Sequence, residues 1–324
     1  MLAIVGATIG GSAIAQRTRA IGLLIEHARE RQMKILHDDP QMSPISAPGD
    51  YRFTFPFEGL AREYLVHVPK SYRGAPTPML MALHGGGGDA DFQADDTRYR
   101  LITQSEHDGF IAVFPNGYSS RESGILATWN AGACCGAAQN KNVDDVGFLR
   151  EVIRRVEHQA RVAKDRVFVT GMSNGALMSW RMACESADLV RGIAPVEGTD
   201  NTATCRPARP VAVIEFHSLD DDHIPFRGGR GVSALTDTNF ASVPATQAKW
   251  TSLDRAVPQA KRVLSVAGAH CDLHAATADG APVELCVTES GGHSWPGGGD
   301  QQGRKQPSTA ISANDLMWKF FSSL

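Results

Sequence analysis

The stretch RVFVTGMSNGALMSW, residues 166–180, constrains the fold more than any other part of the chain. Residues 167–169 are β-branched or aromatic, so they favour a short buried strand. The apolar residues at the end of the stretch favour a helix that buries one face. A strand that turns sharply into a helix at Ser173, between two glycines, has the geometry of a nucleophile elbow. An ordinary turn between a strand and a helix is the alternative.

Strand-like apolar runs recur along the chain and alternate with helical segments. Such alternation predicts an α/β fold, with a mostly parallel central sheet and helices on both faces. The expected strands are 64–68, 79–83, 110–114, 167–170, 192–196, 211–216 and 283–288. The expected helices are 146–163, 176–184 and a final amphipathic helix within 311–324, capped by Ser312 or Asn314.

The length of the chain allows one large α/β domain or two small ones, and the composition is that of an ordinary globular protein. The 324 residues are 42% apolar and carry a net charge of −3, which gives no reason to expect a nucleic acid as partner. Neither a repeat nor a low-complexity linker divides the chain after about residue 48. We therefore expect a single catalytic domain over residues 49–324.

The first residues have the character of a targeting segment. Residues 1–15 are an apolar run that ends in Ala-Ile-Ala, which fits a signal-peptide cleavage site, although basic residues ahead of the run are missing. The run is too short for a transmembrane helix, so we expect no stable membrane insertion. Residues 16–48 are expected to form a propeptide-like or linker segment. These features predict a secreted protein, extracellular or periplasmic.

The six cysteines support the same compartment, because an even number is compatible with disulfides in an oxidising environment. Local spacing favours the pairs Cys184–Cys205 and Cys271–Cys286. Cys134 and Cys135 would then pair with each other or stay free. Since no C-x-x-C pair occurs, a structural zinc site is not expected.

A nucleophilic serine needs a histidine to take its proton and an acid to orient that histidine. In hydrolases built on a parallel sheet, these partners follow in the order serine, acid, histidine. The strand-like run 211–216 leads into Asp220, Asp221 and Asp222, and spacing alone does not choose among them. A solvated turn is one alternative. A metal site that includes His223 is another, but adjacent residues rarely converge on one ion, so no metal is expected.

The best candidate for the general base is His293, because it leaves the last strand-like run into a glycine-rich loop that could reach the elbow. The other histidines after Ser173 precede the acidic loop, adjoin it, or lie ahead of the last strand: His217, His223, His270 and His274.

A glycine loop upstream completes the constellation. The run PMLMALHGGGG ends a strand at His84 and continues into four glycines, residues 85–88. Loops of this kind present backbone N–H groups to an oxyanion, so we expect Gly86 and Asn174, the residue after the nucleophile, to donate. A phosphate cradle is the alternative, but no G-K-[ST] follows the loop.

Together these residues resemble secreted serine esterases of the polyhydroxybutyrate depolymerase and feruloyl esterase type, related to family-one carbohydrate esterases. The matching segments are 83–88, 114–117, 129–136, 143–149, 169–178, 220–226 and 291–297. The resemblance implies an α/β-hydrolase fold with Ser173 as nucleophile and His293 as base. The family's H-G-x-x-D-x-x-V-P loop, set on HSLDDDHIP, implies Asp221 as the acid. Because Ser218 stands where the family has glycine, Asp222 is the runner-up.

The resemblance also implies that Trp129, Asn130 and Trp295 line the acyl or aryl side of the cleft, with ordinary packing as the alternative. The mechanism requires no cofactor. The expected substrates are feruloyl or acetyl esters of plant polysaccharide, or 3-hydroxybutyrate oligomers and polyester. The chain ends 31 residues beyond His293, which favours smaller or soluble esters over crystalline polymer. A non-catalytic carbohydrate-binding protein of the same fold and a peptidase are the rival hypotheses.

Overall fold

The computed structural model describes residues 42–121, 123–234, 236–299 and 305–324. The expected signal peptide, 1–15, and most of the segment 16–48 lie outside these residues. Near the start of the described chain, Ile45 is buried and its N–H donates to the carbonyl of Gln159 at 2.7 Å. The residues just before the first strand therefore pack against the domain, while the division at residue 49 stays a prediction.

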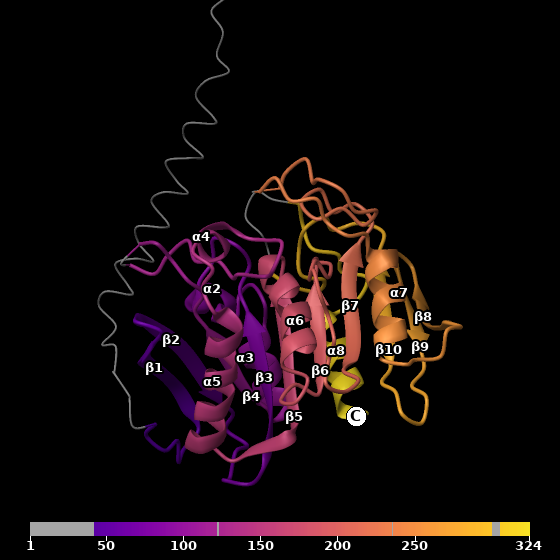
Figure 1. Ribbon diagram of the computed structural model, residues 1–324. Coiled ribbons are helices and arrows are strands. Elements are labelled where there is room, and N and C mark those ends of the chain that lie inside the picture. Colours follow the sequence, from indigo (N-terminus) through magenta and orange to yellow (C-terminus); the bar gives the residue numbers. More distant parts are fainter. Residues whose placement is uncertain (1–41, 122, 235, 300–304) are drawn as a thin grey trace, which may run out of the picture.

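The strands form one ten-stranded sheet in the order β1-β2-β4-β3-β5-β6-β7-β10-β9-β8 (Figure 1). Strands β4, β3, β5, β6, β7 and β10 run parallel to one another, whereas β1 and β2 at one edge and β9 and β8 at the other are joined by antiparallel pairing. The strand bounds are β1 Gly49–Phe57, β2 Leu60–Val68, β3 Thr77–Leu83, β4 Ile111–Pro115, β5 Val162–Met172, β6 Gly192–Val196, β7 Ala212–Ser218, β8 Lys261–Val266, β9 Ala269–His274 and β10 Val283–Thr288.

Helices cover both faces of the sheet, so the expected fold class is confirmed. The apolar cluster on one face includes side chains of α5, α6 and α7, and the cluster on the other face includes side chains of α3 and α8. The helix bounds are α2 Ala90–Ala94, α3 Leu101–Asp108, α4 Gly136–Asn140, α5 Asp145–Gln159, α6 Asn174–Glu185, α7 Val243–Leu253 and α8 Ala313–Ser322. None of the helices in the described part of the chain is both long enough and apolar enough to cross a bilayer.

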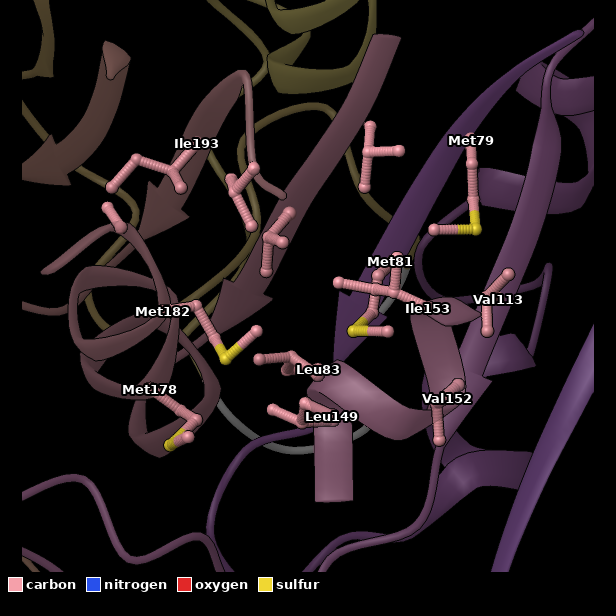
Figure 2. Close-up of a cluster of buried hydrophobic side chains, with 14 of the residues drawn as sticks. Met79, Met81, Leu83, Val113, Leu149, Val152, Ile153, Met178, Met182 and Ile193 are labelled. Atoms are coloured by element: carbon pink, nitrogen blue, oxygen red, sulfur yellow. The ribbon is translucent and has the colours of Figure 1, made fainter. Parts of the chain in front are cut away.

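The packing of β3 against α5 and α6 holds the centre of the sheet in place. Met81 and Leu83 of β3 lie among Leu149 of α5 and Met182 of α6 (Figure 2). All four side chains are buried. Full burial of an apolar side chain stabilises a fold by about 1.5–3 kcal/mol, so this layer fixes the strand ends that carry the candidate site.

The sequence predicted most of the strands but not every boundary. Strands 192–196 and 283–288 are observed with the expected limits, and Ser312 caps α8 by accepting the N–H of Asp315. The expected helix 146–163 was wrong at its end, because α5 ends at Gln159 and Ala160 is already extended. No glycine or proline marks this stop, and the next residues enter the long strand β5.

The expected disulfides Cys184–Cys205 and Cys271–Cys286 are confirmed, and the third pair is Cys134–Cys135. Cys271 and Cys286 stand directly opposite each other on β9 and β10, so this bond joins the antiparallel strand β9 to the parallel part of the sheet. The bond Cys184–Cys205 ties the end of α6 to the loop after β6, with 5.2 Å between the Cα atoms.

Candidate active site

Ser173 occupies the turn between β5 and α6, at backbone angles φ 58° and ψ −118°. A positive φ is uncommon for a residue with a side chain and marks a strained turn. The turn is possible because glycines stand on both sides of it. A Cβ on Gly175 would lie 2.2 Å from the carbonyl oxygen of Leu83, and one on Gly171 would lie 2.4 Å from that of Gly175. The strand and helix could not pack this closely with any other residue.

The three expected catalytic residues follow three strands of the parallel part of the sheet. Ser173 comes after β5, Asp221 after β7 and His293 after β10, and β10 is parallel to β7. Because the carboxyl ends of parallel strands meet at one edge, the three loops share the same edge of the sheet. Ser173 and His293 are partly exposed there, whereas Asp221 is buried.

Asp221 and His293 form a direct pair. Nδ1 of His293 lies 2.8 Å from Oδ2 of Asp221. The other oxygen, Oδ1, accepts the backbone N–H groups of His223 at 2.7 Å and Ile224 at 3.0 Å. These bonds fix the carboxylate, and the carboxylate in turn orients the imidazole so that its Nε2 faces away from the pair.

The pKa values suit a charged acid and a neutral base. Burial would raise the pKa of Asp221, but the hydrogen bond from His293 and the charges of His293 and His217 hold it well below its usual range. Burial lowers the pKa of His293, and this effect outweighs the opposing attraction of Asp221. At neutral pH the imidazole is therefore free to accept a proton.

The neighbouring aspartates have other partners. Oδ1 of Asp220 accepts the N–H of Gly292 at 2.8 Å, so Asp220 holds the loop that carries His293. Asp222 contacts Nδ1 of His223 at 2.7 Å and accepts the hydroxyl of Ser233 at 2.9 Å. In the described part of the chain, neither of the two side chains hydrogen-bonds to His293.

The glycine loop after β3 lies directly against the elbow. A Cβ on Gly85 would lie 3.5 Å from Cβ of Ser173, and one on Gly86 would lie 3.6 Å from Cβ of Asn174. Within the described residues, the N–H groups of Gly86 and Asn174 donate to no backbone carbonyl, and the four loop glycines, 85–88, are partly exposed. Two N–H groups thus remain available beside the serine, one of them at the positive end of the α6 dipole.

The tautomer of His84 is fixed by its two hydrogen bonds. Nε2 accepts the backbone N–H of Gly117 at 2.9 Å, so the neutral ring must carry its proton on Nδ1, which donates to the carbonyl of Gly85 at 2.8 Å. The ring therefore braces the glycine loop from inside the protein.

The side chain of Asn174 ties the elbow to residue 129. Its Oδ1 accepts the N–H of Trp129 at 2.8 Å, and its Nδ2 donates to the carbonyl of the same residue at 3.1 Å. The Trp129 indole N–H donates to the carbonyl of His84 at 2.9 Å. One tryptophan thus links the elbow to the glycine loop, and the side chain of Asn174 is occupied while its backbone N–H stays available.

The residues expected to line the cleft are buried. Trp129 and Trp295 are 0% and 1% exposed, and Asn130 is 6% exposed. The Trp295 indole donates to Oδ1 of Asn314 at 2.8 Å, and the Asn130 amide donates to the carbonyl of Val143 at 3.0 Å. These contacts hold the three side chains inside the protein. Their contact with substrate stays a prediction.

Two further residues adjoin the pair, and of these the sequence motifs did not indicate Glu197. The ring of His223 stacks on the ring of His293, with centroids 4.5 Å apart and an interplanar angle of 12°. Glu197, directly after β6, is fully buried beside Asp221. In the sequence, Glu197 is a single acidic residue at the end of a strand-like run, and such a residue is also typical of an exposed turn.

Donor atoms near the pair could in principle hold a cation, since those of Asp221, His223 and His293 all lie within 4.8 Å of one another. Their arrangement does not suit a metal. The two imidazole rings are stacked, so their in-plane lone pairs run side by side and do not converge on a common point.

Comparison with known proteins agrees with this geometry. Residues 63–195 match the family model described as esterase PHB depolymerase, a region that includes the glycine loop and Ser173. Over these residues the chain is similar to this esterase family. The resemblance expected from the sequence motifs is thereby confirmed.

Two curated relatives and one solved structure illustrate the similarity. Feruloyl esterase B of Piromyces equi is 25% identical over 239 residues, which are 72% of this chain and 42% of the relative. The bifunctional acetylxylan esterase/xylanase XynS20E of Neocallimastix patriciarum is 23% identical over 175 residues, 54% of this chain and 23% of the relative. The chain thus spans less than half the length of either relative. The acetyl xylan esterase from Aspergillus awamori has the same fold, with a TM-score of 0.54, 14% identity and coverage of 81% of this chain and 94% of that one.

Proposed function

We propose that the chain is a secreted serine carboxylic-ester hydrolase with Ser173, His293 and Asp221 as its catalytic triad. The observation that carries the proposal is the 2.8 Å contact between His293 and Asp221, on the sheet edge where Ser173 stands in a strained elbow. Acyl transfer needs a nucleophile in a strained turn, an aspartate paired with a histidine, and two available N–H groups, and all of these lie on one edge of the sheet.

In the proposed mechanism, the Ser173 hydroxyl attacks the ester carbonyl while Nε2 of His293 takes its proton. The N–H groups of Gly86 and Asn174 stabilise the oxyanion, and Asp221 stabilises the imidazolium that forms. The imidazolium then passes its proton to the leaving alcohol, which leaves an acyl group on Ser173. Water then gives a proton to His293 and attacks this acyl-enzyme, the carboxylic acid leaves, and the proton returns from His293 to the Ser173 oxygen.

Acetyl and feruloyl esters of plant polysaccharide are the first substrate class that we propose. The support comes from two curated relatives, which are named as a feruloyl esterase and an acetylxylan esterase. Oligomers of 3-hydroxybutyrate are the second class, supported by the family model. Secretion is supported by the three disulfides, which persist in oxidising compartments.

Covalent labelling with a fluorophosphonate tests the proposal. We expect the wild type to gain one adduct, located by peptide mass spectrometry on Ser173, and Ser173→Ala to gain none. Ser252→Ala, which changes an exposed serine on α7, is the matched control and should be labelled like the wild type. A wild type that stays unlabelled would favour the non-catalytic binding protein.

Substrate class is tested by one assay series with methyl ferulate, acetylated xylan, 3-hydroxybutyrate oligomers and a peptide anilide. We expect the highest kcat/KM on one of the first two esters. Preference for the oligomers would move the substrate to the polyester class, and preference for the anilide would favour a peptidase.

A further inference from the structure

A buried cluster of titratable side chains adjoins Asp221. Glu197, Glu215 and His217 are each 0% exposed. None of them takes part in the proposed mechanism. Carboxyl groups are rarely buried completely unless partners compensate the lost hydration, so the bonds of each group indicate what it does.

The fold holds Glu197 between the ends of β6 and β7. Its backbone N–H donates to the carbonyl of Phe216 at 2.9 Å, and its two carboxyl oxygens lie 3.0 and 3.1 Å from the N–H of Ser218. Its φ of 51° lies in the left-handed region, which is uncommon for glutamate. The elbow adjoins the same segment, because the N–H of Ser173 donates to the carbonyl of Val196 at 2.9 Å. Backbone strain of this kind is retained where a side chain must be aimed.

A carboxyl oxygen of Glu197 lies within 4.8 Å of one of Asp221, and the two buried side chains share a hydrogen bond. Two carboxyl groups can bond to each other only if one of them carries a proton. Asp221 already accepts hydrogen bonds from His293 and from two backbone N–H groups, so its carboxylate is better stabilised as an anion than that of Glu197. Burial and the charge of Asp221 raise the pKa of Glu197 well above its usual value. The shared proton therefore belongs to Glu197.

The other charged groups around Glu197 form a pair of their own. Nε2 of His217 donates to the carbonyl of Ile224 at 2.8 Å and lies 3.5 Å from both Glu197 and Asp221. Its Nδ1 lies 3.5 Å from Oε1 of Glu215. Burial lowers the pKa of His217, but Glu215 and Asp221 raise it by more. Burial raises the pKa of Glu215, and the neighbouring His217 opposes this rise. His217 therefore has Glu215 as a partner of its own, and Glu197 is the carboxyl group that pairs with Asp221.

We propose that Glu197 is a positioning residue, which donates a hydrogen bond from its protonated carboxyl to Asp221 and so holds that carboxylate toward His293. The inference rests on the proposed function. The donated bond takes up part of the negative charge of Asp221, and this weakens the pull of the carboxylate on the imidazole proton. Glu197 therefore keeps the proton affinity of His293 low enough for a base that works at neutral pH.

The pH dependence of kcat/KM on a para-nitrophenyl ester tests this role in two variants. Glu197→Leu removes the donor, so we expect kcat to fall about tenfold, KM to change less than about threefold, and the acidic midpoint to rise by roughly 0.5–1 pH unit. Glu197→Gln is neutral and keeps both a donor and an acceptor, so it should restore kcat to within about threefold of wild type, with an unshifted midpoint.

The glutamine variant also decides the charge of Glu197. If the native carboxyl were ionised, glutamine would remove a negative charge near His293, and the midpoint would move to lower pH. Such a shift would overturn the proposal, and so would a leucine variant with wild-type kcat and midpoint. Thermal unfolding monitored by circular dichroism shows whether Glu197→Leu folds. If it does not, the midpoint of the glutamine variant decides alone.

Asp254→Asn is the matched control, because Asp254 is also fully buried but lies at the opposite end of β7, where it accepts the N–H of Val211 at 2.8 Å. The kcat and the acidic midpoint of Asp254→Asn should equal those of the wild type. A midpoint shift as large as that of Glu197→Leu would contradict the proposal that Glu197 acts through its place beside Asp221. Fluorophosphonate labelling separates the two proposals. A wild type that is not labelled at Ser173 contradicts the proposed function itself, whereas normal labelling with unchanged leucine kinetics contradicts only the role of Glu197.

Discussion

At the residue scale, three adjacent aspartates after β7 differ in what they contact. Asp220 holds the backbone of the His293 loop, Asp221 bonds the imidazole, and Asp222 contacts His223 and Ser233 near the surface. Their sequence positions are almost equivalent, so only the path of the loop distinguishes them.

Asparagine substitutions separate Asp221 from Asp222. We expect Asp221→Asn to lower kcat by about 10³–10⁴-fold, because an amide cannot stabilise the imidazolium and favours the wrong tautomer. Asp222→Asn should keep kcat within about threefold of the wild type, since its partners lie outside the triad. Steady-state kinetics on a para-nitrophenyl ester measure both. The reverse ranking would assign the acid to Asp222.

The order of Ser173, the acidic loop and His293 could be predicted because each follows a strand-like run, and parallel strands bring such ends to one edge. The choice of Asp221 rested on the family motif, because spacing alone leaves the three aspartates equivalent. Glu197 could not be found in this way, since its burial depends on β7 and on the loop beyond it. The burial of Trp129 likewise depends on contacts with His84 and Asn174, which are distant in sequence.

At the element scale, the elbow depends on the close approach of α6 to the end of β3. Gly175 of α6 lies against the carbonyl of Leu83, the last residue of β3, and the loop that carries Gly86 follows this residue. The packing of these two elements therefore sets the distance between Ser173, the proposed nucleophile, and the N–H of Gly86, a proposed oxyanion donor.

Gly175→Ala tests this packing. The added Cβ would stand 2.2 Å from the Leu83 oxygen, so β3 and α6 must move apart, and we expect a loss of roughly 2–4 kcal/mol in unfolding free energy, together with a lower kcat. Gly85→Ala is the control for stability, because its Cβ would have contacts of 3.4 Å or more. Urea unfolding followed by fluorescence compares the two. Equal stability of both variants would contradict the packing account.

Elements with strong local signals were the ones that the sequence predicted. Strand β6 and helix α6 are apolar runs bounded by glycine or polar residues, and their type was evident. Strand β8 was missed because its side chains are mostly exposed and show neither an apolar run nor clear alternation. Strand β9 pairs with β8 and β10, so its partners are set by tertiary structure.

At the scale of the whole molecule, buried acidic side chains lie at both ends of the parallel strands. Glu197 and Asp221 lie beyond the carboxyl ends of β6 and β7, whereas Asp254 lies at the start of β7. Burial raises the pKa of Asp254 to about 7 from its ordinary value of 3.8, although the N–H of Val211 opposes the shift.

The stability of the fold should depend on pH through Asp254. Its raised pKa gives a stabilising contribution that is complete below pH 3.8 and is lost as the pH rises toward 7, because the unfolded chain releases the proton first. Asp254→Asn stays neutral and keeps an acceptor for Val211. We expect its unfolding free energy, relative to wild type, to increase by about 2–4 kcal/mol between pH 4 and pH 7. Urea unfolding at several pH values measures the difference, and a difference that does not change with pH would show that Asp254 is ionised throughout.

The α/β architecture as a whole followed from the alternation of strand-like and helical runs, since a parallel sheet needs a crossover between successive strands. The antiparallel edges did not follow. The hairpin β1–β2 turns at Glu58 and Gly59, both at positive φ, and this turn was not predicted.

The central claim is that Ser173 is the nucleophile of an ester hydrolase, and the kcat/KM of Ser173→Ala on para-nitrophenyl acetate tests it most directly. Wild-type protein and Ser252→Ala should hydrolyse the ester at equal rates, while Ser173→Ala should lose at least about 10³-fold in kcat/KM and keep its thermal midpoint. A Ser173→Ala protein with wild-type turnover would contradict the account.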